Sequence, residues 1–351
     1  MPAKHPAMIF AALALASACS KHDDADAKAR TAGASAPRAA AAASATAGPS
    51  GSAANREAPG ALLGGIAQVA LGARRDCGRK DDGSVWCWAA DGMAKRAAME
   101  ESKQIAVVDA FVCAISPKGH IACTETETGR VIPISLYRDG VVLVGGPTGY
   151  CVRTEDGVLR CGLEDIEKHE VKAPSGLPGL KDPSAFSLGA TVGCAVLDGE
   201  VWCWNNEKGA GMPRTLKGLK GAVSVAVGRL RGCASTTQGE LYCFRADRDA
   251  EPHKLDGWKD VVQLGMAFDA AQPDRLCALT RSGSVVCGAL RGEGDAIEIE
   301  APKVIDGVSD VAELGVGAAS HSCARTKAGN VWCWGLEQTR ASAVRAPAPS
   351  P

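Results

Sequence analysis

The sequence predicts an all-β fold, a seven-bladed β-propeller with one disulfide-stapled hairpin in each blade. The first reason is that fourteen of the fifteen cysteines form seven pairs, six of them spaced by ten residues and one by nine. The second is that these pairs recur at intervals of 36 to 46 residues. A repeat of about 40 residues with several short strands is typical of propellers. The pairs are Cys77 with Cys87, Cys113 with Cys123, Cys151 with Cys161, Cys194 with Cys203, Cys233 with Cys243, Cys277 with Cys287 and Cys323 with Cys333.

The residues between two paired cysteines predict a tight hairpin. In the first pair, a three-residue loop, Asp81-Asp82-Gly83, places Cys77 opposite Cys87. Loops of this length need a left-handed residue at the third position, which is usually glycine. All six pairs with ten-residue spacing have glycine there: Gly83, Gly119, Gly157, Gly239, Gly283 and Gly329.

The fourth pair, with nine-residue spacing, has a loop that is one residue shorter. Its loop is Asp198-Gly199, and Asp-Gly is a strong signal for a two-residue type I′ turn. Cys194 and Cys203 therefore still face each other. The shorter loop supports the same hairpin register in every repeat.

Facing cysteines on antiparallel strands are close enough for a disulfide, so seven disulfides within hairpins are expected. Two alternatives remain open, because free cysteines are often buried and because cysteines bind metals. Zinc sites favour shorter cysteine spacing, and the chain has only six histidines. The disulfides are the favoured interpretation, and no metal or cofactor is expected.

Two further strands precede each hairpin. The segments Pro252–Gly265 and Pro302–Gly315 each contain a short apolar run after the proline and a second one that ends at glycine. Each unit therefore offers about four strands and no helical periodicity. The propeller is expected to span residues 59–336, with the strand near Leu62-Leu63 completing the last sheet.

The first 18 residues have the features of a signal peptide. Lys4 precedes the apolar run Ala7–Ala16, which is too short to span a bilayer. The segment Ala16-Ser17-Ala18-Cys19 resembles the lipobox of bacterial lipoproteins, in which the cysteine is lipidated. Cys19 is therefore the predicted lipidation site, and the alternative is an ordinary signal peptide cleaved after Ala18.

Two segments are predicted to be disordered. Residues 19–58 contain the lipidated cysteine and a stretch rich in Ala, Ser, Gly and Pro that cannot bury enough apolar surface to fold. This stretch is expected to act as a tether between a membrane and the propeller. Residues 337–351, rich in Ala and Pro, are expected to be a frayed tail.

The last repeat carries a family resemblance. The stretches His321-Ser322-Cys323-Ala324-Arg325 and Gly329–Gly335 resemble the repeat of the regulator-of-chromosome-condensation family, in its secreted bacterial form. The resemblance implies a seven-bladed propeller over residues 59–336. The Gly-Gln-Leu-Gly stretch that usually follows Cys-Trp-Gly is absent from every copy. Nucleotide exchange on a small GTPase is therefore not expected.

Aromatic residues flank the second cysteine of several pairs. They are Trp86, Trp88, Trp202, Trp204, Tyr242, Phe244, Trp332 and Trp334. Such residues could form a platform for sugars, but their recurrence at one structural position favours packing between adjacent blades.

The connections opposite the glycine hairpins vary most between repeats and contain many acidic residues. They are the candidate surface for an unknown protein partner, and solvated loops without a ligand are the alternative. The candidate residues are Glu164, Asp165, Glu167, Asp247, Asp249, Asp269, Asp274, Glu293 and Asp295.

The sequence supports binding more than catalysis. It contains no G-x-S-x-G, no H-E-x-x-H and no phosphate-binding glycine loop. The net charge of −1 and the mixed signs give no reason to expect a nucleic-acid partner. We expect a monomeric lipoprotein of the bacterial cell envelope that acts as a protein-binding scaffold. The alternatives are an extracytoplasmic polysaccharide hydrolase or lyase and a purely structural propeller.

Overall fold

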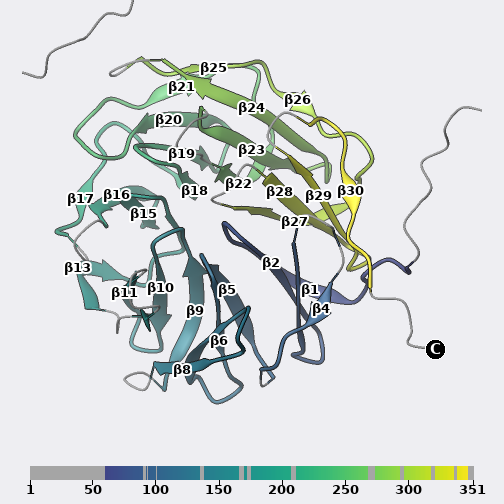
Figure 1. Ribbon diagram of the computed structural model, residues 1–351. Helices are drawn as coiled ribbons and strands as arrows, with labels where there is room; N and C mark the ends of the chain where they lie inside the picture. Colours follow the sequence, from purple (N-terminus) through teal and green to yellow (C-terminus); the bar gives the residue numbers. More distant parts are fainter. Residues whose placement is uncertain are drawn as a thin grey trace, which may run out of the picture. The chain divides into compact units, whose positions relative to one another are not determined.

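The computed structural model describes thirty strands in seven antiparallel sheets, arranged as the blades of a ring (Figure 1). The fold-class prediction is confirmed, and no helix occurs among the described residues. These are residues 60–89, 92, 94–99, 101–134, 138–165, 170–171, 175–206, 211–267, 273–292, 296–317, 321–335 and 338–346. Cys19 and residues 20–58 lie outside them, and so do the tether and signal-peptide predictions.

Each sheet runs from an innermost strand beside the ring axis to an outermost strand. Blades 1 to 3 contain β1 (Ile66–Leu71), β2 (Asp76–Lys80), β3 (Val85–Trp88) and β4 (Lys95–Arg96); β5 (Gln104–Val108), β6 (Phe111–Ile115), β7 (Ile121–Glu125) and β8 (Val131–Ile134); and β9 (Gly140–Gly145), β10 (Gly149–Thr154), β11 (Val158–Asp165), β12 (Glu170–Val171) and β13 (Ser175–Lys181). Blades 4 and 5 contain β14 (Ala185–Leu188), β15 (Val192–Leu197), β16 (Glu200–Asn205) and β17 (Arg214–Thr215); and β18 (Ala222–Val227), β19 (Arg231–Thr236), β20 (Leu241–Arg245) and β21 (His253–Leu255). Blades 6 and 7 contain β22 (Val261–Ala267), β23 (Arg275–Thr280), β24 (Val285–Arg291), β25 (Glu298–Ile299) and β26 (Lys303–Val304); and β27 (Val311–Val316), β28 (His321–Thr326), β29 (Val331–Gly335) and β30 (Ser342–Ala343).

The hairpin between the second and third strands has the predicted turn in every blade. The six glycines at the third loop position have φ between 75° and 83°, the left-handed region that favours glycine. In the short loop both Asp198 (φ 52°) and Gly199 (φ 75°) are left-handed, as a type I′ turn requires.

Seven disulfides join the second and third strands, one in each blade. Every pair of cysteines is directly opposed in the strand register, with Cα atoms 3.9 to 4.1 Å apart. The prediction of one disulfide staple in each blade is therefore confirmed. In chain order, the bonds join Cys77 to Cys87, Cys113 to Cys123, Cys151 to Cys161, Cys194 to Cys203, Cys233 to Cys243, Cys277 to Cys287 and Cys323 to Cys333.

The disulfides also decide between the alternatives left open by the sequence. A sulfur atom bonded to its partner is neither a free thiol nor a thiolate that could bind a metal. Most of the bonded cysteines are inaccessible to solvent, and Cys123, Cys161 and Cys243 in blades 2, 3 and 5 are at most 4% exposed. The staples therefore lie within the packed blades.

The aromatic residues beside the second cysteines pack between blades. Trp88, Trp204, Phe244 and Trp334 are almost completely buried. Trp202 packs against a cluster that includes residues of the preceding blade. This arrangement supports the packing interpretation over the sugar platform.

The tip of each glycine hairpin also contacts the next blade. The N–H of Ser102, which precedes the blade 2 sheet, donates to the carbonyl of Gly83 (3.0 Å). The N–H of Val311 donates in the same way to Gly283 (3.0 Å). At the junction of the last and first blades, the Ile66 N–H donates to Gly329 (3.0 Å). The turns therefore join neighbouring blades as well as neighbouring strands.

The closure of the ring differs from the sequence prediction. The fourth strand of the last sheet is β30, which belongs to the segment expected to be a frayed tail. Leu62 and Leu63 pair with the residues that follow β30, since Leu62 forms a bridge with Arg345 and the Leu63 N–H donates to Val344 (2.9 Å). Both ends of the propeller therefore close the ring. A strand of two residues has too little apolar pattern to be found in a segment rich in Ala and Pro.

Among the described residues, no helix has the length and apolar character needed to cross a bilayer.

Candidate functional site

The connections between first and second strands, and between third and fourth strands, lie on the face opposite the glycine hairpins. We call this the loop face. Of the nine predicted loop residues, Glu167, Asp269, Glu293 and Asp295 lie outside the described residues. Glu164 and Asp165 form the end of β11. The structure describes the side chains of Asp247, Asp249 and Asp274.

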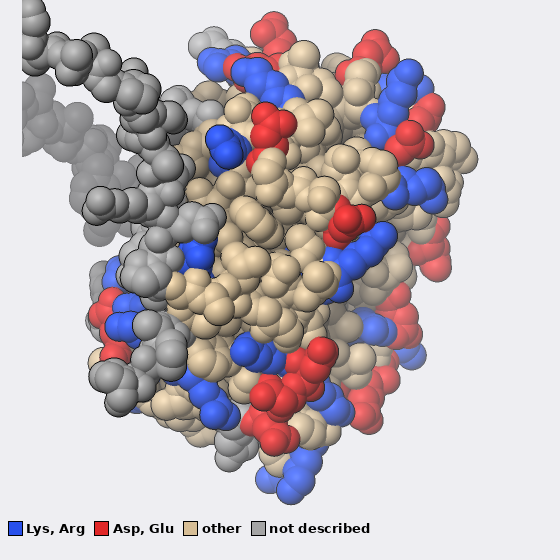
Figure 2. Space-filling model, turned by 90° about the vertical axis from the view of Figure 1, so that its right-hand side faces the viewer, with Lys and Arg blue, Asp and Glu red and all other residues tan. Residues whose placement is uncertain are grey.

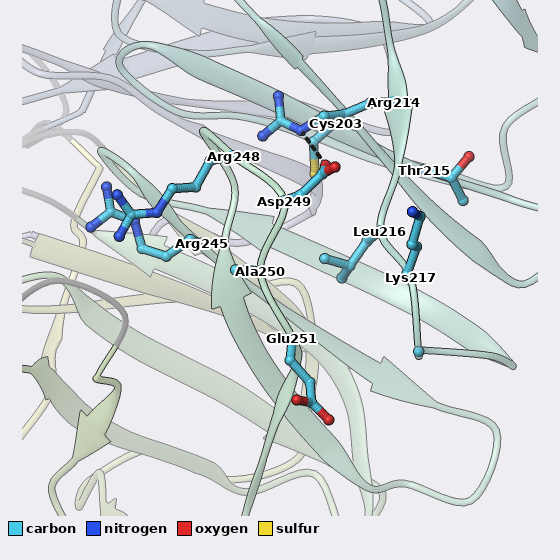
Figure 3. Close-up of a pocket in the computed structure, with 11 residues that line it drawn as sticks. Cys203, Arg214, Thr215, Leu216, Lys217, Arg245, Arg248, Asp249, Ala250 and Glu251 are labelled. Atoms are coloured by element: carbon cyan, nitrogen blue, oxygen red, sulfur yellow. Dashed lines mark ion pairs between the residues drawn. The ribbon is translucent and has the colours of Figure 1, made fainter.

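One of these three side chains, Asp249, lines a cleft between blades 4 and 5 (Figure 3). Asp247 lies two residues earlier in the same connection after β20. The cleft has a volume of about 410 Å³. Its walls are β17 with the residues after it, and the connection that follows β20. The lining residues are Cys203, Arg214, Thr215, Leu216, Lys217, Gly218, Arg245, Arg248, Asp249, Ala250 and Glu251.

Arginines hold the connection after β20 in place. Arg245 donates from Nε and Nη2 to the two carboxylate oxygens of Asp247 (2.8 and 2.7 Å). This bidentate pair lowers the pKa of Asp247 below its ordinary value. Arg214 donates to the Ala246 carbonyl (2.6 Å) and lies 3.5 Å from an oxygen of Asp249, as the dashed line in Figure 3 shows. The loop thus has a defined conformation.

The floor and the rim of the cleft differ in chemistry. Leu216 is buried at the floor, whereas Lys217, Arg248, Asp249 and Glu251 are exposed around it. The carboxylate side chain of Asp249 is 75% exposed. An apolar floor with a charged rim is the common anatomy of a protein–protein contact.

Asp274 lies elsewhere and does not fit the prediction of an exposed acidic loop. Its side chain is buried beside Gly228, where an added Cβ would lie 2.9 Å from the Asp274 carboxylate. Burial raises the pKa of Asp274, and the positive charge of Arg231 opposes this shift. Asp274 therefore packs blade 6 against blade 5 and is not exposed to a partner.

A second cavity occupies the equivalent position between blades 7 and 1. It has a volume of about 540 Å³ and is lined by residues that include Arg75, Trp88 and Trp334. At its edge, His321 Nε2 lies 2.7 and 2.8 Å from the carboxylate oxygens of Asp76. Asp76 could not be predicted as a site residue, because nothing in the local sequence indicates a partner 245 residues away.

The same region contains a possible metal-ligating group. Asp76, Cys323 and Cys333 place their ligand atoms within 4.8 Å of one another. The two sulfur atoms are bonded to each other, however, and metals bind the thiolate. This group is therefore a structural contact in the oxidised protein.

The charged surface has no single dominant sign. On the side shown in Figure 2, lysine and arginine side chains are interspersed with aspartate and glutamate side chains around uncharged areas. This distribution agrees with the net charge of −1. It favours a partner recognised by shape and local pairs over one recognised by a large charged field.

Comparison with known proteins agrees with the fold. Residues 311–338, which cover β27 to β29, match the family model described as the regulator of chromosome condensation (RCC1) repeat. No curated protein matches the chain by sequence.

Several solved structures share the fold at low identity. Human WBSCR16 is 11% identical with a TM-score of 0.60, and the match covers 74% of this chain and 86% of that one. Prp20p from Saccharomyces cerevisiae is 14% identical with a TM-score of 0.55, covering 72% of this chain and 80% of that one. PorZ, described as a bacterial surface component of the type-IX secretion system of Porphyromonas gingivalis, is 13% identical with a TM-score of 0.54, covering 82% of this chain and 39% of that one. The chain is therefore a seven-bladed β-propeller that carries an RCC1 repeat in its last blade.

Proposed function

We propose that this propeller is an extracytoplasmic scaffold, tethered to a membrane through Cys19, that binds a protein partner on its loop face. The cleft between blades 4 and 5 is the observation that carries the proposal. It combines an apolar floor at Leu216 with a loop that arginine pairs hold in one conformation. A preorganised surface loses little conformational entropy when a partner binds.

Seven disulfides support the extracytoplasmic location. Disulfides form and persist in oxidising compartments and are rare in the cytosol. The lipid anchor rests on the resemblance of residues 16–19 to a lipobox. PorZ, which has a similar fold, is described as a bacterial surface component. The same fold therefore occurs in a protein outside the cytoplasm.

The alternative of a polysaccharide hydrolase or lyase has less geometric support. Glycoside hydrolysis commonly uses two carboxyl groups held about 5–10 Å apart on either side of a sugar bond. The cavity between blades 7 and 1 has aromatic walls that suit a sugar, but its described lining offers one carboxylate, Asp76, which His321 engages. We therefore favour the binding scaffold.

Site-specific photo-cross-linking in the native envelope tests the proposal. A photoreactive residue at Asp249 in the cleft should give one defined cross-linked protein. The matched control is Gln238, which is exposed on the glycine hairpin of the same blade and therefore on the opposite face. The proposal is supported if the Asp249 position alone gives the product. It is wrong if both positions give the same products or if neither gives any.

A further inference from the structure

The innermost strands of the seven blades surround the ring axis, and we call the space between them the channel. Side chains on these strands hydrogen-bond to the backbone of the innermost strand of the next blade. The Gln68 carboxamide donates to the Ile105 carbonyl (2.8 Å) and accepts from the Ile105 N–H (2.9 Å). Gln263 makes the same two bonds with Leu314 (3.0 and 2.9 Å). Glutamine at this position therefore hydrogen-bonds to both the N–H and the C=O of one residue in the following blade.

Three other blades make one bond of this type. The Leu143 N–H donates to Gln104 Oε1 (2.9 Å), and the Leu264 N–H donates to Ser224 Oγ (3.3 Å). In the last blade Glu313 replaces glutamine, and its Oε2 accepts from the Val69 N–H (3.3 Å). In five of the seven blades, a channel-facing backbone N–H or C=O of the innermost strand thus hydrogen-bonds to a polar side chain of the preceding blade.

The two remaining peptide groups belong to Phe186 in blade 4 and Val225 in blade 5. Phe186 faces Ala195 and Val225 faces Ala234, and each of these alanines directly follows the first cysteine of its hairpin. Ile105 faces Ala114, which occupies the same position in blade 2. Because facing pairs alternate along an antiparallel ladder, these N–H and C=O groups point away from the second strand and toward the channel.

The preceding blades offer these two groups no polar side chain. The residues equivalent to glutamine are Val142 in blade 3 and Ala185 in blade 4, as their pairing with Arg153 and Val196 shows. Blade 4 bonds to a different peptide, because the Val227 N–H donates to Ser187 Oγ (3.2 Å). Among the described residues, no side chain accepts from or donates to the peptide groups of Phe186 and Val225. A peptide group without a partner costs free energy unless water or a ligand supplies one.

A cavity of about 280 Å³ lies at this place. Val142, Ala185, Phe186 and Val225 all line it, together with Ser224, Gln263 and Arg153. The Arg153 Nε is buried and has no hydrogen-bond acceptor among the described residues. The cavity thus borders two residues whose N–H and C=O groups have no side-chain partner among the described residues, in a volume just below the range of pockets that hold whole small molecules.

We propose that this channel cavity is a binding site for a primary carboxamide group. A carboxamide has one acceptor and two donors, and glutamine shows in blades 1 and 6 that it pairs with the same type of peptide group. The carboxamide belongs either to a small-molecule amide or to a glutamine or asparagine side chain of a protein inserted into the channel. The site lies on the channel wall, whereas the proposed partner surface lies on the loop face, so the two proposals fail independently.

Nuclear magnetic resonance of the intact chain tests the proposal with three isosteric probes. Butyramide carries the carboxamide, butyrate carries a carboxylate, and pentan-2-one has the carbonyl without an N–H. Butyramide should shift the Phe186 and Val225 amide signals saturably, and the other two probes should do so at least about tenfold more weakly, since each lost hydrogen bond to a buried group costs about 1–3 kcal/mol. No saturable shift with butyramide, or equal shifts with all three probes, would show that the cavity holds water only.

Two substitutions build the missing side chain and should block the site. Val142→Gln should bond to Phe186 as Gln104 bonds to Leu143, and Ala185→Gln should bond to Val225. Each variant should slow hydrogen exchange of its own target amide about fivefold, for about 1 kcal/mol of hydrogen bonding, and leave the other unchanged. The double variant should lose the response to butyramide. An unchanged response in a folded double variant would overturn the proposal.

A conservative variant covers the case in which glutamine does not fit. Ala185→Ser should reach the Val225 N–H as Ser224 reaches Leu264, and it should reduce the butyramide response at Val225. A full response at Val225 in this variant, with exchange of that amide slowed, counts against the site. Peptides with a central Gln or a central Glu distinguish the source. A shift with the Gln peptide assigns the site to a protein side chain, and a shift with butyramide alone assigns it to a small amide.

Discussion

The imidazole Nε2 of His321 in the last blade lies 2.7 Å from a carboxylate oxygen of Asp76 in the first blade. Asp76 is 4% exposed, and the N–H of Gly72, a second donor to its carboxylate, is farther away at 3.4 Å. The contact with His321 therefore supplies the main partner of a buried carboxylate at the junction that closes the ring.

Replacing His321 with alanine should destabilise the propeller. The change leaves a buried carboxylate without its main partner, so we expect a loss of about 2–3 kcal/mol in the free energy of unfolding. Thermal and denaturant unfolding measure the loss. In a double-mutant cycle, Asp76→Asn combined with His321→Ala should cost less than the sum of the single changes. Additive effects would show that the two side chains do not interact.

Two glycines with similar backbone angles should respond differently to alanine. Gly129 has φ of 72° and no neighbour within 4 Å of an added Cβ, so Gly129→Ala should cost about 1–2 kcal/mol for the left-handed conformation alone. Gly119 has φ of 80°, and its added Cβ would lie 2.6 Å from the carbonyl oxygen of Arg138. Gly119→Ala should therefore lower the melting temperature more. Equal shifts would argue against the packing of the hairpin tip on the next blade.

Glu313→Gln should change how stability depends on pH. Burial raises the folded-state pKa of Glu313, and the hydrogen bond from Arg325 opposes this shift (2.8 Å). Between the ordinary glutamate pKa and this raised value, the folded state binds more protons than the unfolded state, so the stability of the unsubstituted chain falls as pH rises. Glutamine cannot ionise. The stability of the variant relative to the parent should therefore increase as pH rises above about 4.5. Parallel stability curves from pH 4 to 7 would contradict this expectation.

Non-reduced peptide mapping should recover all seven disulfides within hairpins. Removing one by the double change Cys277→Ala and Cys287→Ala should cost about 3 kcal/mol, as expected for a closed loop of about ten residues. Calorimetry of the variant measures the loss. Peptides linked between different repeats would contradict the pairing.

Cys19→Ala tests the proposed lipid anchor. The change should move the protein from the membrane fraction to the soluble fraction, because a residue that carries no lipid loses the apolar chains that insert into the bilayer. Fractionation with immunodetection measures the distribution, and Ser20→Ala serves as the matched control. Unchanged partitioning of the Cys19 variant would remove the anchor from the proposal.

The local turn chemistry was enough to predict the hairpins. Glycine at the third loop position and the Asp198-Gly199 pair each determine a turn type, and the turn type determines the register of the strands. The seven cysteine pairs follow from that register. These features depend on residues within about ten positions of one another, so a single repeat contains all the information.

The contacts between blades could not be predicted in the same way. The bond between His321 and Asp76, the burial of Asp274 and the glutamine bonds around the channel all depend on how one blade sits beside the next. The candidate loop residue Asp249 lines a cleft, but the sequence did not reveal the arginines that contact Asp247 and Asp249. Pairing across blades needs the packed structure.

The backbone hydrogen bonds that join the two ends of the propeller constrain how the protein folds during synthesis. Residues 344–346 bond to Ala61 and Leu63 on one side and to Gly92 and Ala94 on the other. A ribosome makes the first of these partners long before it makes the last. The nascent protein must therefore remain an open arc, with blade 1 incompletely covered, until residues 344–346 emerge. Replacing residues 342–346 with a Gly-Ser segment should leave it in that immature state, exposed to proteases and chaperones.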